Sequence, residues 1–180
     1  MVEISLHILD IVRNSIKAEA TEIGISVVED TKKNLLAVEI TDNGKGMSEE
    51  FVKNVTDPFV TMRKTRKVGL GLSLFKSAAE LTGGGLEIQS KLGEGTKVTA
   101  TFVYDSIDRM PLGDTAFTMV TLVSCNPDID FVYTHTYNGK SFEFSTKKIK
   151  EVLNGVFIGE QDVLHWIEEY IADGLCEIKK

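Results

Sequence analysis

The stretch TDNGKGM, residues 41–47, follows directly on aliphatic residues that alternate at positions 36, 38 and 40. This alternation is typical of a half-buried strand, and Asp42 keeps the same phase, so its carboxylate is expected to face the buried side. A buried carboxylate without a partner is costly, and a ligand with N–H groups, such as the exocyclic amine of adenine, would satisfy it. A simple turn at Asp42-Asn43-Gly44 would account for the same residues without a ligand. Gly46, however, adds a position at which a flat ligand can approach the backbone.

The block HILDIVRNSIKAEA, which starts at His7, predicts a helix over 4–20. Its polar side is expected to hold His7, Asp10, Asn14 and Lys17. An amide oxygen such as that of Asn14 ligates Mg²⁺ alongside phosphate oxygens, and Lys17 reaches a phosphate as a point charge. Asp10 can orient or deprotonate an attacking hydroxyl or water. A solvated helix face is the alternative explanation for the same residues.

The block KVGLGLSLFKSAAELTGGG predicts a helix over 71–82. The residues before and in its first turn are Gly69, Leu70, Gly71 and Leu72. Their backbone N–H groups and the helix dipole make an anion site. The preceding loop carries cations such as Lys64, which suit a lid over a polyphosphate, although a solvated charge run explains them too. Thr96, where a later strand begins, offers a small hydroxyl near the ligand.

Hydrophobic patterns along the chain predict an α+β fold, a two-layer α/β sandwich in which helices cover a mixed, mainly antiparallel sheet. Besides the two long helices and a short one capped by Ser48, strands are expected around 23–27, 36–42, 86–88 and 98–102. Residues 1–104 are therefore expected to form one domain. The polar segment 105–114, with a proline and a glycine, is expected to be a linker.

A small α+β region is expected over 115–180. Strands are predicted over 116–124 and 130–145, the latter with a tight turn at Asn138-Gly139. Helices are predicted over 146–154 and 160–173, the second ended by Gly174.

Composition narrows the class of protein. The 180 residues are 42% hydrophobic, which is enough for a core. The net charge of −7 argues against a general nucleic-acid binder, which would carry a basic stripe. The apolar runs are too short to cross a bilayer, and Glu3, His7 and Asp10 interrupt any signal-peptide pattern. Cys125 and Cys176 form neither a disulfide framework nor a metal-binding spacing. A cytoplasmic protein without membrane or nucleic-acid partners is expected.

The blocks together, over roughly residues 4–104, resemble the ATPase superfamily shared by sensor histidine kinases, type II DNA topoisomerases, mismatch-repair ATPases, large heat-shock chaperones and anti-sigma-factor serine kinases. Asn14 is similar to the N-box asparagine that holds Mg²⁺. DNGKGM resembles the G1 box, with Asp42 as the adenine-reading aspartate. DPF, ending at Phe59, resembles the F box, and VGLGL with GEGT resembles the G2 region. The resemblance implies ATP and Mg²⁺ as ligands, with ATP between helices and a lid.

The sequence also departs from the branches of this superfamily. The ATP-hydrolysing and serine-kinase branches place a glutamate four residues before the asparagine, where this chain has the shorter Asp10. Lys17 and the F box follow the pattern of histidine kinases. The chain starts inside the helix of Asn14, so the dimerisation hairpin that carries their acceptor histidine is expected to be missing.

The expected function is a stand-alone, Mg²⁺-dependent regulatory kinase or ATPase that acts on a partner protein through residues 115–180. The alternatives are an anti-sigma-type serine/threonine kinase with Asp10 as base, a non-catalytic ATP sensor, and a clamp that dimerises on nucleotide. Asp10 is the expected catalytic residue and Asn14 the expected metal ligand. The expected ATP contacts are Asn14, Lys17, Asp42, Gly44, Gly46, Met47, Phe59, Lys64, Gly69, Leu70, Gly71, Leu72 and Thr96.

Overall fold

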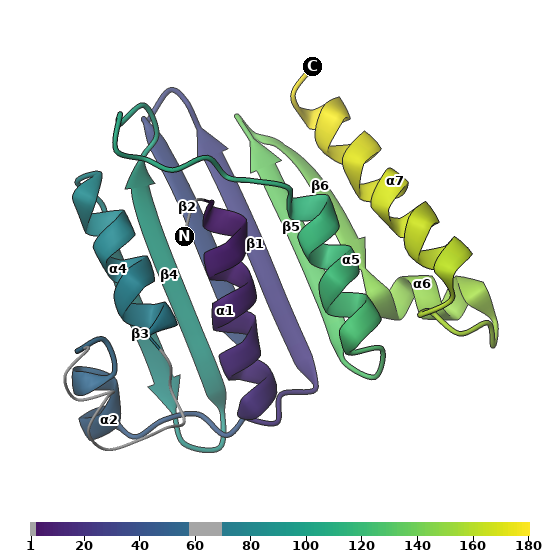
Figure 1. The fold of residues 1–180 in the computed structure, drawn as a ribbon, viewed down its shortest axis with the longest axis horizontal. Helices are drawn as coiled ribbons and strands as arrows, with labels where there is room; N and C mark the ends of the chain where they lie inside the picture. Colours follow the sequence, from purple (N-terminus) through teal and green to yellow (C-terminus); the bar gives the residue numbers. More distant parts are fainter. Residues whose placement is uncertain (1–2, 58–69) are drawn as a thin grey trace.

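Six strands of the described residues form one mixed sheet. The computed structural model describes residues 3–57 and 70–180, and its strands are ordered β3-β4-β2-β1-β5-β6 across the sheet (Figure 1). They are β1 (Glu22–Asp30), β2 (Leu35–Asp42), β3 (Gly85–Lys91), β4 (Gly95–Val103), β5 (Asp130–Tyr137) and β6 (Lys140–Ser145). Neighbouring strands are antiparallel except β1 and β5, which run parallel. The mixed, mainly antiparallel sheet predicted from the sequence is confirmed.

Helices cover one face of this sheet, which makes the fold a two-layer sandwich (Figure 1). They are α1 (Ile4–Lys17), α2 (Glu49–Asn54), α4 (Gly71–Leu81), α5 (Thr115–Cys125), α6 (Thr146–Leu153) and α7 (Gln161–Ile178). Helix α1 contacts α4 on one side and α5 on the other. Across the described ranges, no helix combines the length and the apolar character that a membrane span requires.

The alternating pattern of the strands places aliphatic side chains on the helix-facing side of the sheet. Ile40 of β2 lies opposite Ile25 of β1 and Val98 of β4, and all three are buried. Glu39, in the other phase of β2, forms an ion pair with Lys97 at 2.8 Å. A slip of one residue would move every aliphatic side chain to the uncovered face, so burial on one side fixes the register. The strand therefore ends with Asp42 on the helix-facing side.

The strand predicted over 116–124 is wrong, because these residues lie in helix α5. A short apolar run rich in β-branched residues fits a buried strand and a buried helix equally well. The deciding signal is Asp114, whose carboxylate caps the helix by accepting a hydrogen bond from the Phe117 N–H at 2.8 Å. The buried Met119 and Leu122 then follow at helical spacing.

Two predicted helix ends also differ from the structure. Helix α1 stops at Lys17 rather than residue 20, because Glu19 adopts a left-handed conformation with φ of 60° and the chain turns into β1. Helix α7 continues through Gly174 to Ile178. A Cβ at Gly174 would collide with the ring of Phe142, so this glycine serves close packing inside the helix and does not stop it. The tight turn at Asn138-Gly139 is confirmed between β5 and β6.

The segment predicted as a linker, 105–114, contains no helix or strand but is held against α1. The N–H groups of Ile4 and Ser5 donate hydrogen bonds to the carbonyl oxygens of Pro111 and Leu112, at 3.0 and 2.8 Å. These N–H groups belong to the first turn of α1 and have no acceptor within the helix. The segment therefore completes the start of α1.

Residues after 114 extend the same sheet, since β5 pairs with β1 along its whole length. A buried polar cluster joins the two parts. The Glu29 carboxylate of β1 lies 2.7 Å from His135 Nε2 of β5 and 2.9 Å from Lys179 Nζ at the end of α7. The hydroxyl of Tyr104 donates to the same carboxylate at 3.1 Å, and Tyr133 contacts His135 Nδ1 at 2.7 Å.

Glu29 is the charged centre of this cluster. Burial alone would raise the pKa of its carboxyl, but the hydrogen bonds and positive charge of His135 and Lys179 prevail and lower that pKa from 4.5 to about 2. A carboxyl that binds its proton less tightly in the folded state stabilises that state when it is ionised.

We predict that Glu29 contributes on the order of 3 kcal/mol to the free energy of unfolding above pH 4.5, and that this contribution disappears as the pH falls to about 2. Urea unfolding at a series of pH values, for the native chain and Glu29→Gln, measures it. The difference between the two proteins should shrink through this window, whereas Glu39→Gln, on the uncovered face, should change little. A difference that stays constant from 4.5 to 2 contradicts the assignment.

Candidate functional site

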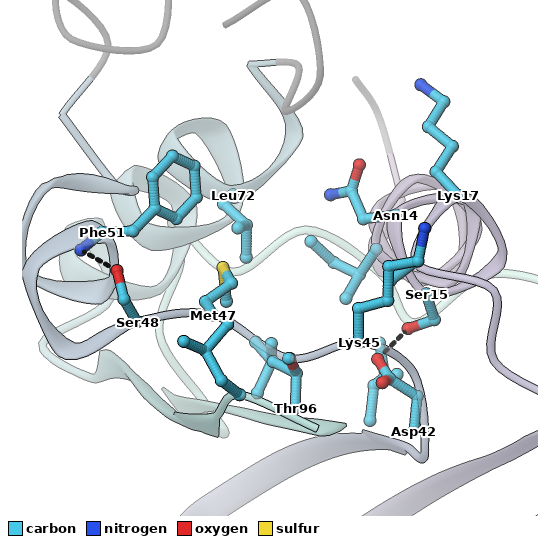
Figure 2. A pocket seen from close by; sticks show the side chains of 16 residues that line it. Asn14, Ser15, Lys17, Asp42, Lys45, Met47, Ser48, Phe51, Leu72 and Thr96 are labelled. Atoms are coloured by element: carbon cyan, nitrogen blue, oxygen red, sulfur yellow. Dashed lines mark hydrogen bonds between the residues drawn. The ribbon is translucent and has the colours of Figure 1, made fainter. Parts of the chain in front are cut away.

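A cavity of about 710 Å³ lies between the end of β2, the start of β4, helix α1, and the segment that leads into α2 (Figure 2). Its size suits a small-molecule ligand. The described residues that line it are Ile11, Asn14, Ser15, Lys17, Ala18, Ile40, Asp42, Lys45, Gly46, Met47, Ser48, Phe51, Leu72, Leu92, Thr96 and Val98. Most of its wall is aliphatic or aromatic, with polar groups from α1 and from the β2 end.

Asp42 faces this cavity, as the strand pattern predicts (Figure 2). Its carboxylate is not unpaired, which corrects one part of the sequence argument. Oδ2 accepts a hydrogen bond from the Ser15 hydroxyl at 2.5 Å, and Oδ1 accepts one from the Gly44 N–H at 2.9 Å. A carboxylate has about four acceptor positions. These bonds fix its orientation and leave about half of that capacity for a ligand.

The glycines of the loop are required by the packing of the protein itself. Gly46 has a φ of +68°, and a Cβ there would fall on the Lys91 carbonyl of β3. A Cβ at Gly44 would stand 2.7 Å from the Ala18 carbonyl oxygen. Asn43 fastens the same loop, because its side-chain oxygen accepts hydrogen bonds from the N–H groups of Thr21 and Glu22. The loop is therefore held rigidly beside α1.

Ser90 of β3 links the loop to β4. Its hydroxyl accepts a hydrogen bond from the Met47 N–H at 2.8 Å and lies 2.8 Å from the Thr96 hydroxyl. Thr96 stands opposite Asp42 in the β2–β4 register. Met47 and Thr96, two of the expected ATP contacts, thus both line the cavity.

Asn14 and Lys17 approach the cavity from α1. Figure 2 shows the Asn14 amide turned toward the cavity, and the Lys17 amine extending away from Asp42. Lys45 also lines the cavity, and its amine pairs with Glu19 at 2.7 Å. Asp42 thus lies at one end of the cavity, with Lys45 beside it, and the Asn14 amide and Lys17 lie farther along α1 (Figure 2).

Asp10 does not line the cavity that the described residues enclose. It pairs with Arg13 at 3.4 Å, and its Cβ would be 3.2 Å from a Cβ placed on Gly71. Gly71 is the first residue of α4, where backbone N–H groups have no acceptor within the helix. Leu70 precedes it and Leu72 lines the cavity. The structure thus brings Asp10 to the start of α4, one turn from Asn14.

His7 is not on the solvent-facing side of α1, which corrects the sequence prediction. Its side chain is 2% exposed and stacks on Phe75 of α4, with 5.0 Å between ring centres. Burial lowers the pKa of this histidine below 6.5, only partly countered by Asp10. Neither ring nitrogen has a hydrogen-bond partner among the described residues. The ring therefore acts as an aromatic contact between α1 and α4.

Three expected site residues, Phe59, Lys64 and Gly69, lie outside the described residues. Two further residues, Ser15 and Ser90, are not predicted from the sequence, and they position the Asp42 end of the cavity. Ser15 follows Asn14 directly, so a polar residue next to the amide was the available signal. Ser90 carries no such signal, because its role depends on contacts between separate strands.

Comparisons with known proteins identify the family, and the matched residues include all those that line the cavity. The profile of the family described as histidine kinase-, DNA gyrase B-, and HSP90-like ATPase matches residues 2–106. A putative sensor protein of Shewanella frigidimarina is 35% identical over 97 residues, which cover 53% of this chain and 15% of that protein. Sporulation kinase D of Bacillus subtilis is 34% identical over 96 residues, which cover 52% of this chain and 18% of that protein. The chain thus spans less than a fifth of these relatives.

Among solved structures, the N-terminal domain of a DNA repair protein superposes with a TM-score of 0.55 at 15% identity, over 79% of this chain and 52% of that one. This likeness shows a shared fold. The superposed part, 79% of the chain, contains more residues than the stretch from residue 1 to residue 106. The shared fold therefore includes part of the region after residue 106. With a family match over more than half of its length, the chain belongs to the histidine kinase-, DNA gyrase B-, and HSP90-like ATPase family.

Proposed function

We propose that this chain is a Mg²⁺-dependent ATP-binding protein that works as a regulatory kinase or ATPase on a partner protein. The observation that carries the proposal is the pair formed by Asp42 and Asn14. The carboxylate from the end of β2 and the amide from α1 face one cavity (Figure 2).

The Asp42 end of the cavity fits an adenine base. A purine has two flat apolar faces, and the walls beside Asp42 include Ile40, Met47 and Val98. Its exocyclic amine donates hydrogen bonds, and Asp42 keeps acceptor positions open for it. Because Ser15 holds the carboxylate in place, little conformational freedom is lost on binding.

The Asn14 end fits phosphates and a divalent cation. Backbone N–H groups at Leu70, Gly71 and Leu72 begin α4 and suit phosphate oxygens, and Lys17 adds a mobile positive charge. Among the described residues, no group of three or more His, Cys, Asp or Glu side chains could hold a metal alone. A bound Mg²⁺ would therefore share the Asn14 amide oxygen with phosphate oxygens, and would neutralise part of their charge.

Asp10 is the proposed base for phosphoryl transfer or hydrolysis, since it stands next to the start of α4 and one turn from Asn14. A second candidate function, a non-catalytic ATP sensor, is favoured by one observation. The Asp10 carboxylate is engaged by Arg13 and does not line the cavity enclosed by the described residues.

The region over 115–180 is the proposed partner-binding part. The support is positional. Strands β5 and β6 extend the sheet on the side away from β3 and β4, and α7 packs against them, so a partner bound there leaves the cavity accessible (Figure 1).

We predict that Asp42→Asn weakens ATP binding by about tenfold to a hundredfold, because a charged acceptor of the adenine amine is lost. The free energy of unfolding should fall by no more than about 1–2 kcal/mol, since an asparagine oxygen can keep one of the two internal hydrogen bonds. Titration calorimetry measures the affinity. Glu39→Gln, on the same strand but the opposite face, should bind ATP like the native chain. Unchanged ATP affinity in a strongly destabilised Asp42→Asn protein would make this carboxylate structural only.

We predict that Asn14→Ala weakens binding of Mg²⁺-ATP more than binding of ATP in the presence of a chelator, because only the metal complex uses the amide oxygen as a ligand. Parallel titrations of both proteins with and without Mg²⁺ give the comparison. Equal losses under the two conditions would exclude Asn14 as a metal ligand.

We predict that Asp10→Asn keeps the affinity for ATP and lowers phosphoryl transfer or hydrolysis by about a hundredfold or more. The measurement is incubation with γ-labelled ATP and cell extract, which separates labelled protein from free phosphate. Identical turnover in the native and Asp10→Asn proteins would remove Asp10 from the chemistry. No label and no free phosphate from the native protein would leave the sensor as the function.

A further inference from the structure

A row of aromatic side chains lies exposed on α7 and continues onto β6. Trp166 is 47% exposed and Tyr170 is 40% exposed, and their rings are stacked with 5.2 Å between centres. Phe142 of β6 packs against Tyr170 at 5.5 Å, in the space left free by Gly174. Large aromatic side chains are usually buried, and exposed clusters of them mark surfaces that bind other molecules.

Acidic residues flank this aromatic row. Asp162 lies four residues before Trp166 on α7, and Asp173 lies three residues after Tyr170, so each neighbours an aromatic ring along the helix surface. Both are exposed and form no ion pair with any described residue. The surface therefore combines aromatic faces with two exposed carboxylates that have no ion-pair partner within 4 Å in the described part of the chain. Asp162 also lies in the first turn of α7, and Asp173 lies within electrostatic range of Lys180. Arginine matches both features, because its guanidinium stacks on aromatic rings and pairs with carboxylates.

We propose that the surface formed by Trp166, Tyr170, Phe142, Asp162 and Asp173 binds an arginine-containing segment of the partner protein. This inference rests on the partner-binding role proposed for residues 115–180, and it is independent of nucleotide binding. A second copy of the chain could also cover this surface. We consider it the less suitable ligand, because two copies of this acidic surface repel each other and the chain carries a net charge of −7.

Trp166 is the single tryptophan of the chain, so its fluorescence reports directly on this surface. The probe is a synthetic peptide in which arginine alternates with valine, compared with a peptide that carries glutamate in place of arginine, both without nucleotide. The arginine peptide is expected to change the emission of Trp166 in a saturable manner, and the glutamate peptide is not. Raising the salt concentration should weaken the interaction.

Matched variants separate a specific surface from general attraction to a negative protein. The double variant Asp162→Asn with Asp173→Asn should lose about fivefold to tenfold in affinity for the arginine peptide. Asp108→Asn, also exposed but in the segment between β4 and α5, should bind like the native chain (Figure 1). Trp166→Ala, followed by calorimetry, should lose binding while its circular dichroism stays native.

Each remaining outcome overturns the proposal. Equal binding of both peptides, or an equal loss for Asp108→Asn, means that no specific arginine site exists. A Trp166 emission that changes with protein concentration alone, together with a dimer in sedimentation, means that a second copy occupies the surface. ATP affinity measured on the same Asp162→Asn and Asp173→Asn protein should be native, so failure of the peptide site and failure of the ATP site are distinguished.

Discussion

The hydrogen bond from Ser15 to Asp42 joins the two elements on which the site depends. It connects α1, which carries Asn14, to the end of β2, across 2.5 Å. The carboxylate reaches this position because β2 buries one face only, so its phase is fixed by the aliphatic residues before it. A shift of α1 against the sheet would break this bond and separate Asn14 from Asp42. The geometry of the cavity is thus set by the packing of the core.

The same rigidity appears in the loop after β2. Gly44, Gly46 and Asn43 are explained by contacts with Ala18, Lys91 and the start of β1, all within the protein. A loop held by its own backbone presents its polar groups in a defined direction, which lowers the cost of binding. The region after residue 114 belongs to this rigid unit as well. Strand β5 pairs with β1, and Glu29 of β1 forms ion pairs with His135 of β5 and with Lys179.

Local patterns were sufficient to predict much of the fold and part of the site. Strand alternation placed Asp42 on the helix-facing side, and helical spacing placed Asn14 on the cavity side of α1. The prediction over 116–124 is wrong because a short β-branched run carries no periodicity that separates helix from strand. The sequence signal that does separate them is Asp114, which caps the helix. The prediction that His7 lies on the polar side of α1 is wrong, because the identity of a polar residue does not show that helix α4 packs over its side chain. Ser90 and the Glu29–His135 pair join residues far apart in sequence, so no local pattern predicts them.

If the Asp42 carboxylate held by Ser15 selects adenine, the protein must discriminate between the two purine bases. At the position of the adenine amine, guanine carries a carbonyl oxygen, which would face the Asp42 carboxylate as acceptor against acceptor. Titration calorimetry with ATP and with GTP, both in the presence of Mg²⁺, measures this difference. We expect saturable binding of ATP and an affinity for GTP that is lower by at least about a hundredfold. Equal affinities for the two nucleotides, or no binding of either, would contradict it.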